Sequence, residues 1–264
     1  MNNRFAVAGL LALAIPAALA AQTAPSKDFH WSGKLAAGQR LEIKGVNGAI
    51  HATGTTSGTA DVSARKHSEN GRSDPNDVKI VVVNTPEAVT ICAVYPTPDD
   101  ADRDNTCEQG SRWHSNTRDN DVVVDFTIQV PTGAEFEGQT VNGDVEATSL
   151  TGNTNVHTVN GSIDVSTSGR AEANTVNGSI RASMGKTDFE EASFRTVNGG
   201  ITLTMPADLN TEVRAETVNG DLDSDWPVTI VGKWGPRRMH GTIGKGGRSL
   251  TLATVNGDIK LRKS

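Results

Sequence analysis

At residues 175–182 the chain reads TVNGSIRA, and the first four of these residues, Thr-Val-Asn-Gly, occur six times in the sequence. The copies begin at Thr140, Thr158, Thr175, Thr196, Thr217 and Thr254, so the spacings between successive copies are 18, 17, 21, 21 and 37 residues. A seventh copy, Gly45-Val46-Asn47-Gly48, lies far upstream and lacks the threonine. A period near 20 residues indicates a repeat protein, in which each unit buries its apolar side chains only against its neighbours.

Each repeat is expected to contain two short strands and two turns. Polar and apolar residues alternate after Asn-Gly, as in Ser179-Ile180-Arg181-Ala182, which is typical of a strand with one buried face. A second strand then leads into the next Thr-Val, as in residues 213–217. Glycine tolerates positive φ and asparagine tolerates it better than most residues, so the Asn-Gly pairs are predicted to be turns. These pairs are Asn47-Gly48, Asn142-Gly143, Asn160-Gly161, Asn177-Gly178, Asn198-Gly199, Asn219-Gly220 and Asn256-Gly257.

Two folds are compatible with these turns. Asn-Gly between alternating strands is a strong signal for a two-residue hairpin, which would give an antiparallel β-sandwich. A hairpin, however, gives no reason for the flanking Thr and Val to recur. In a β-solenoid, equivalent residues stack in columns about 4.8 Å apart, and identical neighbours then pack equally well at every level. The sequence therefore favours an all-β solenoid, a β-helix-like stack of short strands with coils of about 20 residues.

The organisation along the chain follows from composition. Residues 1–20 have a positive start, an apolar run and an Ala-x-Ala site, which predict a cleaved signal peptide and export to the periplasm or the cell exterior of a bacterium. Residues 21–28 are predicted to be a flexible leader, 29–131 an irregular β-rich part and 132–264 the regular array, together forming one elongated domain. The spacing of 37 suggests a degraded copy near residues 241–244, and the cationic strand at 258–263 is expected to end the stack.

Charge and cysteine content narrow the functional classes. The formal net charge is −6, so there is no global electrostatic case for nucleic-acid binding. No segment after the signal peptide is apolar enough to be expected to cross a membrane. The two cysteines, Cys92 and Cys107, are predicted to form a disulfide, because an even cysteine count in an exported chain is typical of structural bridges.

The sequence contains few candidates for catalytic or metal-binding motifs. The six histidines lack metal-ligand spacing, and Asp100, Asp102 and Asp104 imitate a calcium loop without its glycine and distal glutamate. No cofactor and no catalytic residue is therefore predicted. Carboxylates on successive coils could still hydrolyse glycosides, which keeps a polysaccharide-active β-helix enzyme as an alternative. The carboxylates concerned are Asp144, Asp164, Asp221 and Asp258.

A ligand surface is predicted where the repeat is interrupted. Residues 221–253 carry Trp226, Trp234, Arg237 and Arg238 among glycines and prolines. Aromatic planes beside cations suit a glycan, anionic lipid headgroups or a protein partner. The alternative is a loop that packs its tryptophans inward.

The alternating strand at residues 122–131, followed by Thr-Val-Asn-Gly-Asp-Val and further Asn-Gly-x-Ile repeats, resembles the putative adhesin family of exported bacterial domains, which is related to the toast-rack domains of envelope-stress proteins. The resemblance implies a stacked β-fold at the cell envelope and supplies no catalytic residue. We therefore expect a non-enzymatic surface scaffold that binds a cell-surface, glycan or envelope-protein partner, with homo-oligomers as one option. An envelope-stress sensory or regulatory module is the alternative.

Overall fold

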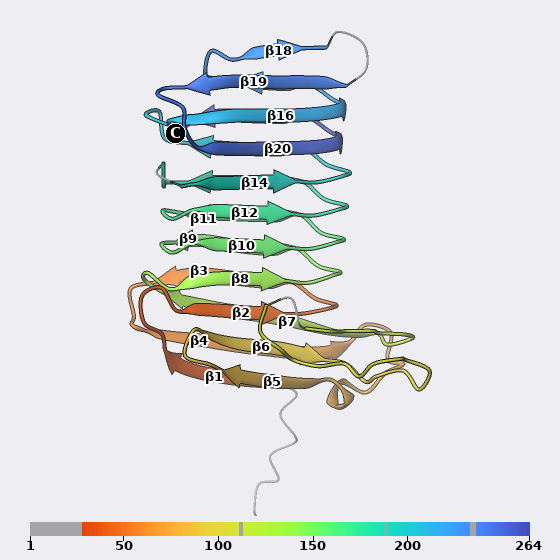
Figure 1. Ribbon diagram of the computed structural model, residues 1–264. Coiled ribbons are helices and arrows are strands. Elements are labelled where there is room, and N and C mark those ends of the chain that lie inside the picture. The colour runs from red at the N-terminus through yellow and green to blue at the C-terminus, as the bar shows by residue number, and fades with distance from the viewer. Residues whose placement is uncertain (1–27, 111–112, 188, 233–235) are drawn as a thin grey trace, which may run out of the picture.

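The computed structural model describes residues 28–110, 113–187, 189–232 and 236–264. These residues form strands β1 to β21 and one 3₁₀ helix, η1 (Pro75–Asp77), without an α-helix. The strands build two sheets that rise side by side through an elongated stack (Figure 1). The predicted all-β fold is confirmed. The predicted signal peptide and most of the leader lie outside the described residues, and Asp28 begins β1.

The two sheets have a defined strand order. Sheet A contains, in spatial order, β1 (Asp28–Lys34), β4 (Thr59–Ser68), β7 (Val122–Pro131), β3 (Ile50–Thr55), β9 (Val145–Leu150), β11 (Ile163–Thr167), β13 (Ile180–Met184), β15 (Ile201–Met205), β21 (Ile259–Lys263) and β17 (Leu222–Ser224). Sheet B contains β18 (Thr229–Val231), β19 (Arg237–Ile243), β16 (Thr211–Asn219), β20 (Ser249–Asn256), β14 (Glu191–Arg195), β12 (Ala171–Asn174), β10 (Thr154–His157), β8 (Glu135–Gln139), β2 (Arg40–Lys44), β6 (Ala88–Val94) and β5 (Lys79–Asn84).

One coil consists of a strand in sheet B, a corner and a strand in sheet A. In the central coil, β12 leads through the corner at residues 175–178 into β13. Each of these strands pairs in parallel with its counterparts in the coils above and below. Parallel stacking confirms the predicted solenoid, because Asn-Gly hairpins would have made these pairs antiparallel. Antiparallel pairs occur instead near the two ends of the stack.

The corner asparagines form a continuous hydrogen-bonded ladder. In each step the side-chain Oδ1 of one asparagine accepts from Nδ2 of the next, over 2.7–2.8 Å. The ladder runs through Asn47, Asn142, Asn160, Asn177, Asn198, Asn256 and Asn219. The predicted column of equivalent residues therefore exists, and it includes the upstream copy.

The other residues of the motif have equally specific places in the corner. The buried hydroxyl of Thr175 donates to the carbonyl oxygen of Gly161 in the adjacent coil over 2.9 Å, and the other five motif threonines repeat this bond. A Cβ at Gly178 would overlap the carbonyl group of Gly161, so the close approach of coils requires glycine. Val176 points outward and is 37 % exposed. Threonine and glycine recur for packing reasons, which a hairpin could not have explained.

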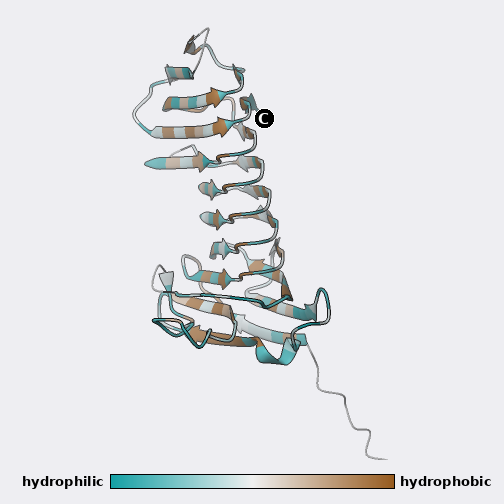
Figure 2. Cartoon of the chain, turned by 90° about the vertical axis from the view of Figure 1, so that its right-hand side faces the viewer, coloured by the Kyte–Doolittle hydropathy of each residue, from teal (hydrophilic) through white to brown (hydrophobic). Residues whose placement is uncertain are grey.

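Along each coil strand, alternate residues enter a shared core. Ile163, Ile180 and Ile201 lie over one another in sheet A and are at most 1 % exposed. Phe136 and Phe194, at different register positions of sheet B, enter the same core and are at most 1 % exposed. The alternation of apolar and polar residues is visible along the strands (Figure 2). Since the apolar side chains point inward, the polar ones form the two outer faces.

The order of coils differs from the order of the sequence at the C-terminal end. We predicted that the strand at 258–263 ends the stack, and this is wrong. β21 lies between β15 and β17, while β20 lies between β14 and β16. The last coil therefore fills a level that the chain had skipped.

The predicted degraded corner at residues 241–244 is also wrong. Gly241, Thr242 and Ile243 belong to β19, which pairs antiparallel with β16 and with β18. The long segment between the last two motif copies forms this hairpin and not a decayed coil. The hairpin extends sheet B beyond the last corner (Figure 1).

At the N-terminal end, Asp121 organises a loop through its carboxylate. It accepts hydrogen bonds from the backbone N–H groups of Asn70, Arg72 and Ser73 over 2.9–3.2 Å. Burial alone would raise the pKa of Asp121, but these donors, with the hydroxyls of Ser73 and Ser68, bring the pKa well below its ordinary value.

We expect Asp121 to make the stability of the fold depend on pH in the acidic range. A carboxyl with a depressed folded pKa stabilises the fold fully above its unfolded pKa, about 3.9, and loses that contribution as the pH falls through the lower folded value. The Asp121→Asn variant should therefore unfold more easily than the parent chain at neutral pH, and the difference should narrow below about pH 4. Urea unfolding at several pH values measures this. A difference that stays constant into acid would contradict the prediction.

The structure joins Cys92 of β6 to Cys107 in a disulfide, with a Cα–Cα distance of 5.6 Å. This fixes a loop over the outer face of sheet B, where Glu42 and Lys44 of β2 are fully buried. Lys44 Nζ lies 3.6 Å from Glu42 Oε2 and donates to the carbonyl oxygen of Gly110 in the loop. One outer face is thus locally covered by chain. Within the described residues no helix has the length and apolar character that spanning a bilayer requires.

Candidate interaction surface

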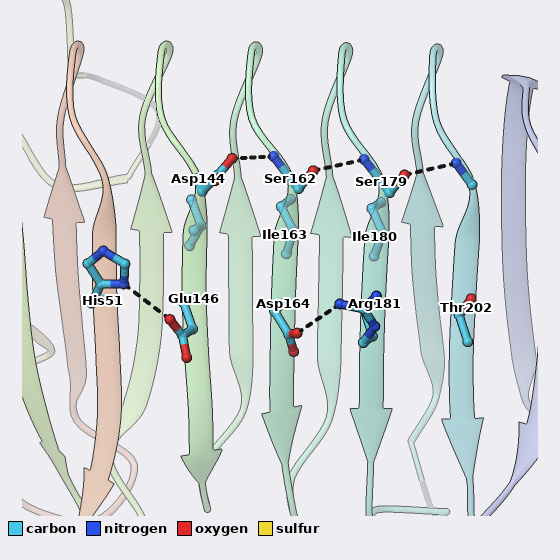
Figure 3. Close-up of a pocket in the computed structure, with 12 residues that line it drawn as sticks. His51, Asp144, Glu146, Ser162, Ile163, Asp164, Ser179, Ile180, Arg181 and Thr202 are labelled. Atoms are coloured by element: carbon cyan, nitrogen blue, oxygen red, sulfur yellow. Dashed lines mark hydrogen bonds and ion pairs between the residues drawn. The ribbon is translucent and has the colours of Figure 1, made fainter.

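The outer face of sheet A carries a shallow groove that crosses several coils (Figure 3). We call it the polar groove. Its polar lining consists of His51, Asp144, Glu146, Ser162, Asp164, Ser179, Arg181 and Thr202. These side chains come from β3, β9, β11, β13 and β15 and from the residues just before those strands.

The repeat itself places these residues. After each Asn-Gly, the first and third residues point outward, as Ser162 and Asp164 do, while Ile163 between them enters the core. Because the coils are in register, the first positions form one row and the third positions form a second row. The groove is therefore a direct product of the period of the sequence.

The first row is held rigidly by bonds between coils. Asp144 Oδ1 accepts from the backbone N–H of Ser162 over 2.7 Å. Ser162 Oγ in turn accepts from Ser179, and Ser179 Oγ accepts from Gly200, both over 3.3 Å. Each side chain thus bonds to the backbone of the next coil, which fixes the spacing of the row.

The second row contains acidic groups next to His51 and Arg181. His51 Nδ1 lies 3.2 Å from Glu146 Oε2, and Arg181 Nη1 lies 3.3 Å from Asp164 Oδ2 (Figure 3). The four side chains remain 46–76 % exposed, so water screens both pairs and leaves their outer edges free for a partner. Thr202 continues the row, followed in register by Lys260 and Asp223.

The predicted carboxylates do not converge on one point. Asp144, Asp258 and Asp221 belong to the first row, whereas Asp164 belongs to the second. Glu146 and Asp164 are register neighbours, and strands about 4.8 Å apart would suit a retaining glycosidase on spacing alone. Their open, solvated setting lacks the enclosure that usually tunes a catalytic acid. The arrangement is suited to recognition of a polar partner.

The predicted ligand surface at the C-terminal end is arranged differently. Trp226 is 7 % exposed and packs at the end of the core, with Lys263 Nζ 5.4 Å from its ring centroid. Arg237 pairs with Asp221, and Arg238 Nη2 lies 3.0 Å from Glu216 Oε1. Trp234 lies outside the described residues. The indole of Trp226 thus presents no open face, and the two arginines are already engaged with carboxylates.

Among the residues that the structure describes, no three His, Cys, Asp or Glu side chains are grouped to hold a metal ion. In the calcium-like stretch, Asp100 Oδ2 accepts from Arg118 Nη1 over 2.7 Å.

Sequence reasoning did not identify the polar groove. The alternation within each strand was evident, but the outward positions of successive repeats form rows only when the repeats are aligned. His51, Glu146 and Arg181 were therefore missed, although their fixed offset from Asn-Gly places them in one row. Aligning the third residue after each Asn-Gly would have found them.

Among the solved structures that are similar to the chain are two bacterial proteins. One is described as a putative cell adhesion protein from Clostridium sporogenes, with 12 % identity, a TM-score of 0.43, and coverage of 90 % of this chain and 100 % of that one. The other is described as a putative adhesin from Bacteroides fragilis, with 15 % identity, a TM-score of 0.37, and coverage of 90 % and 97 %. No curated protein sequence matches the chain.

A family model described as Toastrack DUF4097 matches residues 109–262. The match covers more than half of the 264 residues and includes six of the seven ladder asparagines. It also spans most of the coils that form the polar groove. The chain therefore belongs to the Toastrack DUF4097 family.

Proposed function

We propose that this protein is an exported cell-envelope scaffold that presents the polar groove to a partner on the cell surface without turning over a substrate. The observation that carries the proposal is the regular outer face of sheet A. Its rows repeat at the strand spacing, and hydrogen bonds between coils hold the first row in place.

The rigidity of the face favours binding. A partner that meets a preorganised surface does not have to order it, so less of the interaction energy is lost. The fixed positions of acidic and basic groups in the second row add specificity, since a misaligned partner would bring like charges together. An extended polar partner, such as a glycan chain or a strand-rich envelope protein, could contact several coils at once.

Export is supported by the disulfide between Cys92 and Cys107, because such bonds persist mainly in oxidising compartments. The signal-like residues 1–20 point the same way. The proposed compartment is the periplasm or the cell exterior.

The test compares two charge reversals on opposite faces. Arg181→Glu changes the second row of the polar groove, and Arg195→Glu makes the same change on an exposed residue of β14 in sheet B. We expect the purified oxidised chain to bind whole cells or envelope fragments. Arg181→Glu should weaken this binding by at least about tenfold, because it reverses a charge on the contact face and places a like charge beside Asp164. Arg195→Glu should bind like the parent chain.

Equal binding by both variants would exclude the polar groove as the contact face, and absence of binding by the parent chain would exclude the scaffold role. Catalysis is checked separately on a panel of polysaccharides. Turnover that disappears in the Asp164→Asn or Glu146→Gln variant would replace this proposal with the enzyme alternative.

A further inference from the structure

We propose that Asn219 and Asn70 are the sites at which this protein spontaneously deamidates, and that the asparagine ladder protects the other Asn-Gly pairs. The described chain has eight such pairs, seven in the ladder and one, Asn70-Gly71, in the loop organised by Asp121. All eight share the Asn-Gly dipeptide, in which the two reacting groups lie. Differences in reactivity must therefore come from the fold.

The reaction requires two groups of one Asn-Gly pair to meet. The backbone nitrogen of glycine loses its proton and attacks Cγ of the preceding asparagine, forming a C–N bond. The side-chain amide leaves as ammonia and carries that proton away, which gives a five-membered succinimide. Water then opens either imide bond to yield aspartate or isoaspartate, so one water is consumed and one ammonia released. Glycine favours the attack because it has no side chain beside the nitrogen.

Inside the ladder both reacting groups are held apart by hydrogen bonds. The N–H of Gly161 donates to the carbonyl oxygen of Asn177 over 3.0 Å, so this nitrogen is directed at the next coil. The side chain of Asn160 donates to Asn142 and accepts from Asn177, both over 2.8 Å. The same N–H bond occurs at Gly48, Gly143, Gly161, Gly178, Gly199 and Gly257. The corresponding asparagine Oδ1 atoms all accept a bond from the next rung.

Asn219 occupies the end of the ladder. Its Nδ2 donates to Asn256 over 2.8 Å, but among the described residues neither its Oδ1 nor the N–H of Gly220 has a partner. Both groups are therefore freer to meet than in any interior rung. Exposure does not explain the difference, because Asn177 in the middle of the ladder is exposed as well.

Asn70 lies outside the ladder. Its own N–H donates to Asp121, but within the described part of the chain the side chain of Asn70 and the N–H of Gly71 make no hydrogen bond. Both residues are exposed, and Gly71 has a φ of 71°. This pair has no neighbouring coil to hold it.

The experiment is peptide mapping by mass spectrometry after the intact oxidised chain is incubated at mildly alkaline pH. We expect Asn219 and Asn70 to deamidate at least about tenfold faster than Asn142, Asn160 and Asn177, because reaction in the interior must wait for local opening of the stack. In denaturant the eight pairs should react at similar rates. Similar rates in the folded chain, or a slow Asn219, would overturn the proposal.

A ladder variant tests the cause. Asn256→Ala removes the rung that donates to Asn198 Oδ1 and accepts from Asn219. We expect deamidation of Asn198 to accelerate, while Asn142, which keeps both neighbouring rungs, stays slow. Circular dichroism checks that the variant remains folded, and a Thr251→Ala variant, changed on an outward position of β20, controls for general loosening. An unchanged rate at Asn198 in a folded variant would contradict protection by the ladder.

Discussion

Replacing Gly178 with alanine is expected to prevent the chain from forming a stable stack. A Cβ at this position would overlap the carbonyl oxygen and carbon of Gly161 and would lie 2.8 Å from the amide nitrogen of Ser162. Backbone atoms of the adjacent coil cannot move aside without separating the coils. Separation would disturb both the asparagine ladder and the bond from Thr175 to Gly161.

The expected loss of stability is on the order of 4 kcal/mol or more, the range reached by few single substitutions. Urea unfolding followed by circular dichroism measures it, and failure to obtain folded protein counts as the same result. Gly58→Ala is the matched control, because a Cβ there meets no atom within 4 Å. It should change stability by less than about 0.5 kcal/mol. Comparable stability of the two variants would show that the coils can tolerate a side chain at the corner.

Replacing Lys44 with methionine is expected to produce the second large effect. The ammonium of Lys44 is fully buried beneath the loop that carries Cys107, between Glu42 and Glu137. Glu42 is buried as well and also accepts from Thr90 Oγ1 and from the N–H of Gly110. Methionine keeps the approximate length of the side chain but leaves the two carboxylates with Arg40 as their remaining cation in this cluster.

Removing one partner of a buried ion pair leaves an uncompensated charge, which typically reduces stability by about 3–5 kcal/mol. We expect the Lys44→Met variant to approach this range, and the Lys44→Met/Glu42→Leu double variant to regain part of the loss. Arg181→Met on the exposed pair with Asp164 should cost at most about 1 kcal/mol. Equal losses for Lys44→Met and Arg181→Met, measured by chemical unfolding of the oxidised chain, would contradict this account of the cluster.

The sequence predicts which side chains of the site point outward, but not which of them are neighbours. The pattern of residues such as Ser162-Ile163-Asp164 determines which side chains point outward, but it does not say that His51 and Glu146 are neighbours. Their positions are 95 residues apart, and the intervening chain forms the N-terminal end of the stack. The burial of Glu42 and Lys44 was hidden in the same way, because Gly110, which covers them, is 68 and 66 residues away in the sequence.

The repeated Thr-Val-Asn-Gly by itself determined the all-β class, the two strands per coil and the column of asparagines. It could do so because the motif threonine bonds to a corner glycine and the asparagine bonds to its own equivalent, so the pattern of contacts is the same at every level. That same equivalence left the order of levels undetermined, since any corner fits against any other. Only the tertiary structure decided that the coil of β20 and β21 lies between β14/β15 and β16/β17, through core contacts and parallel registers that join segments distant in the chain.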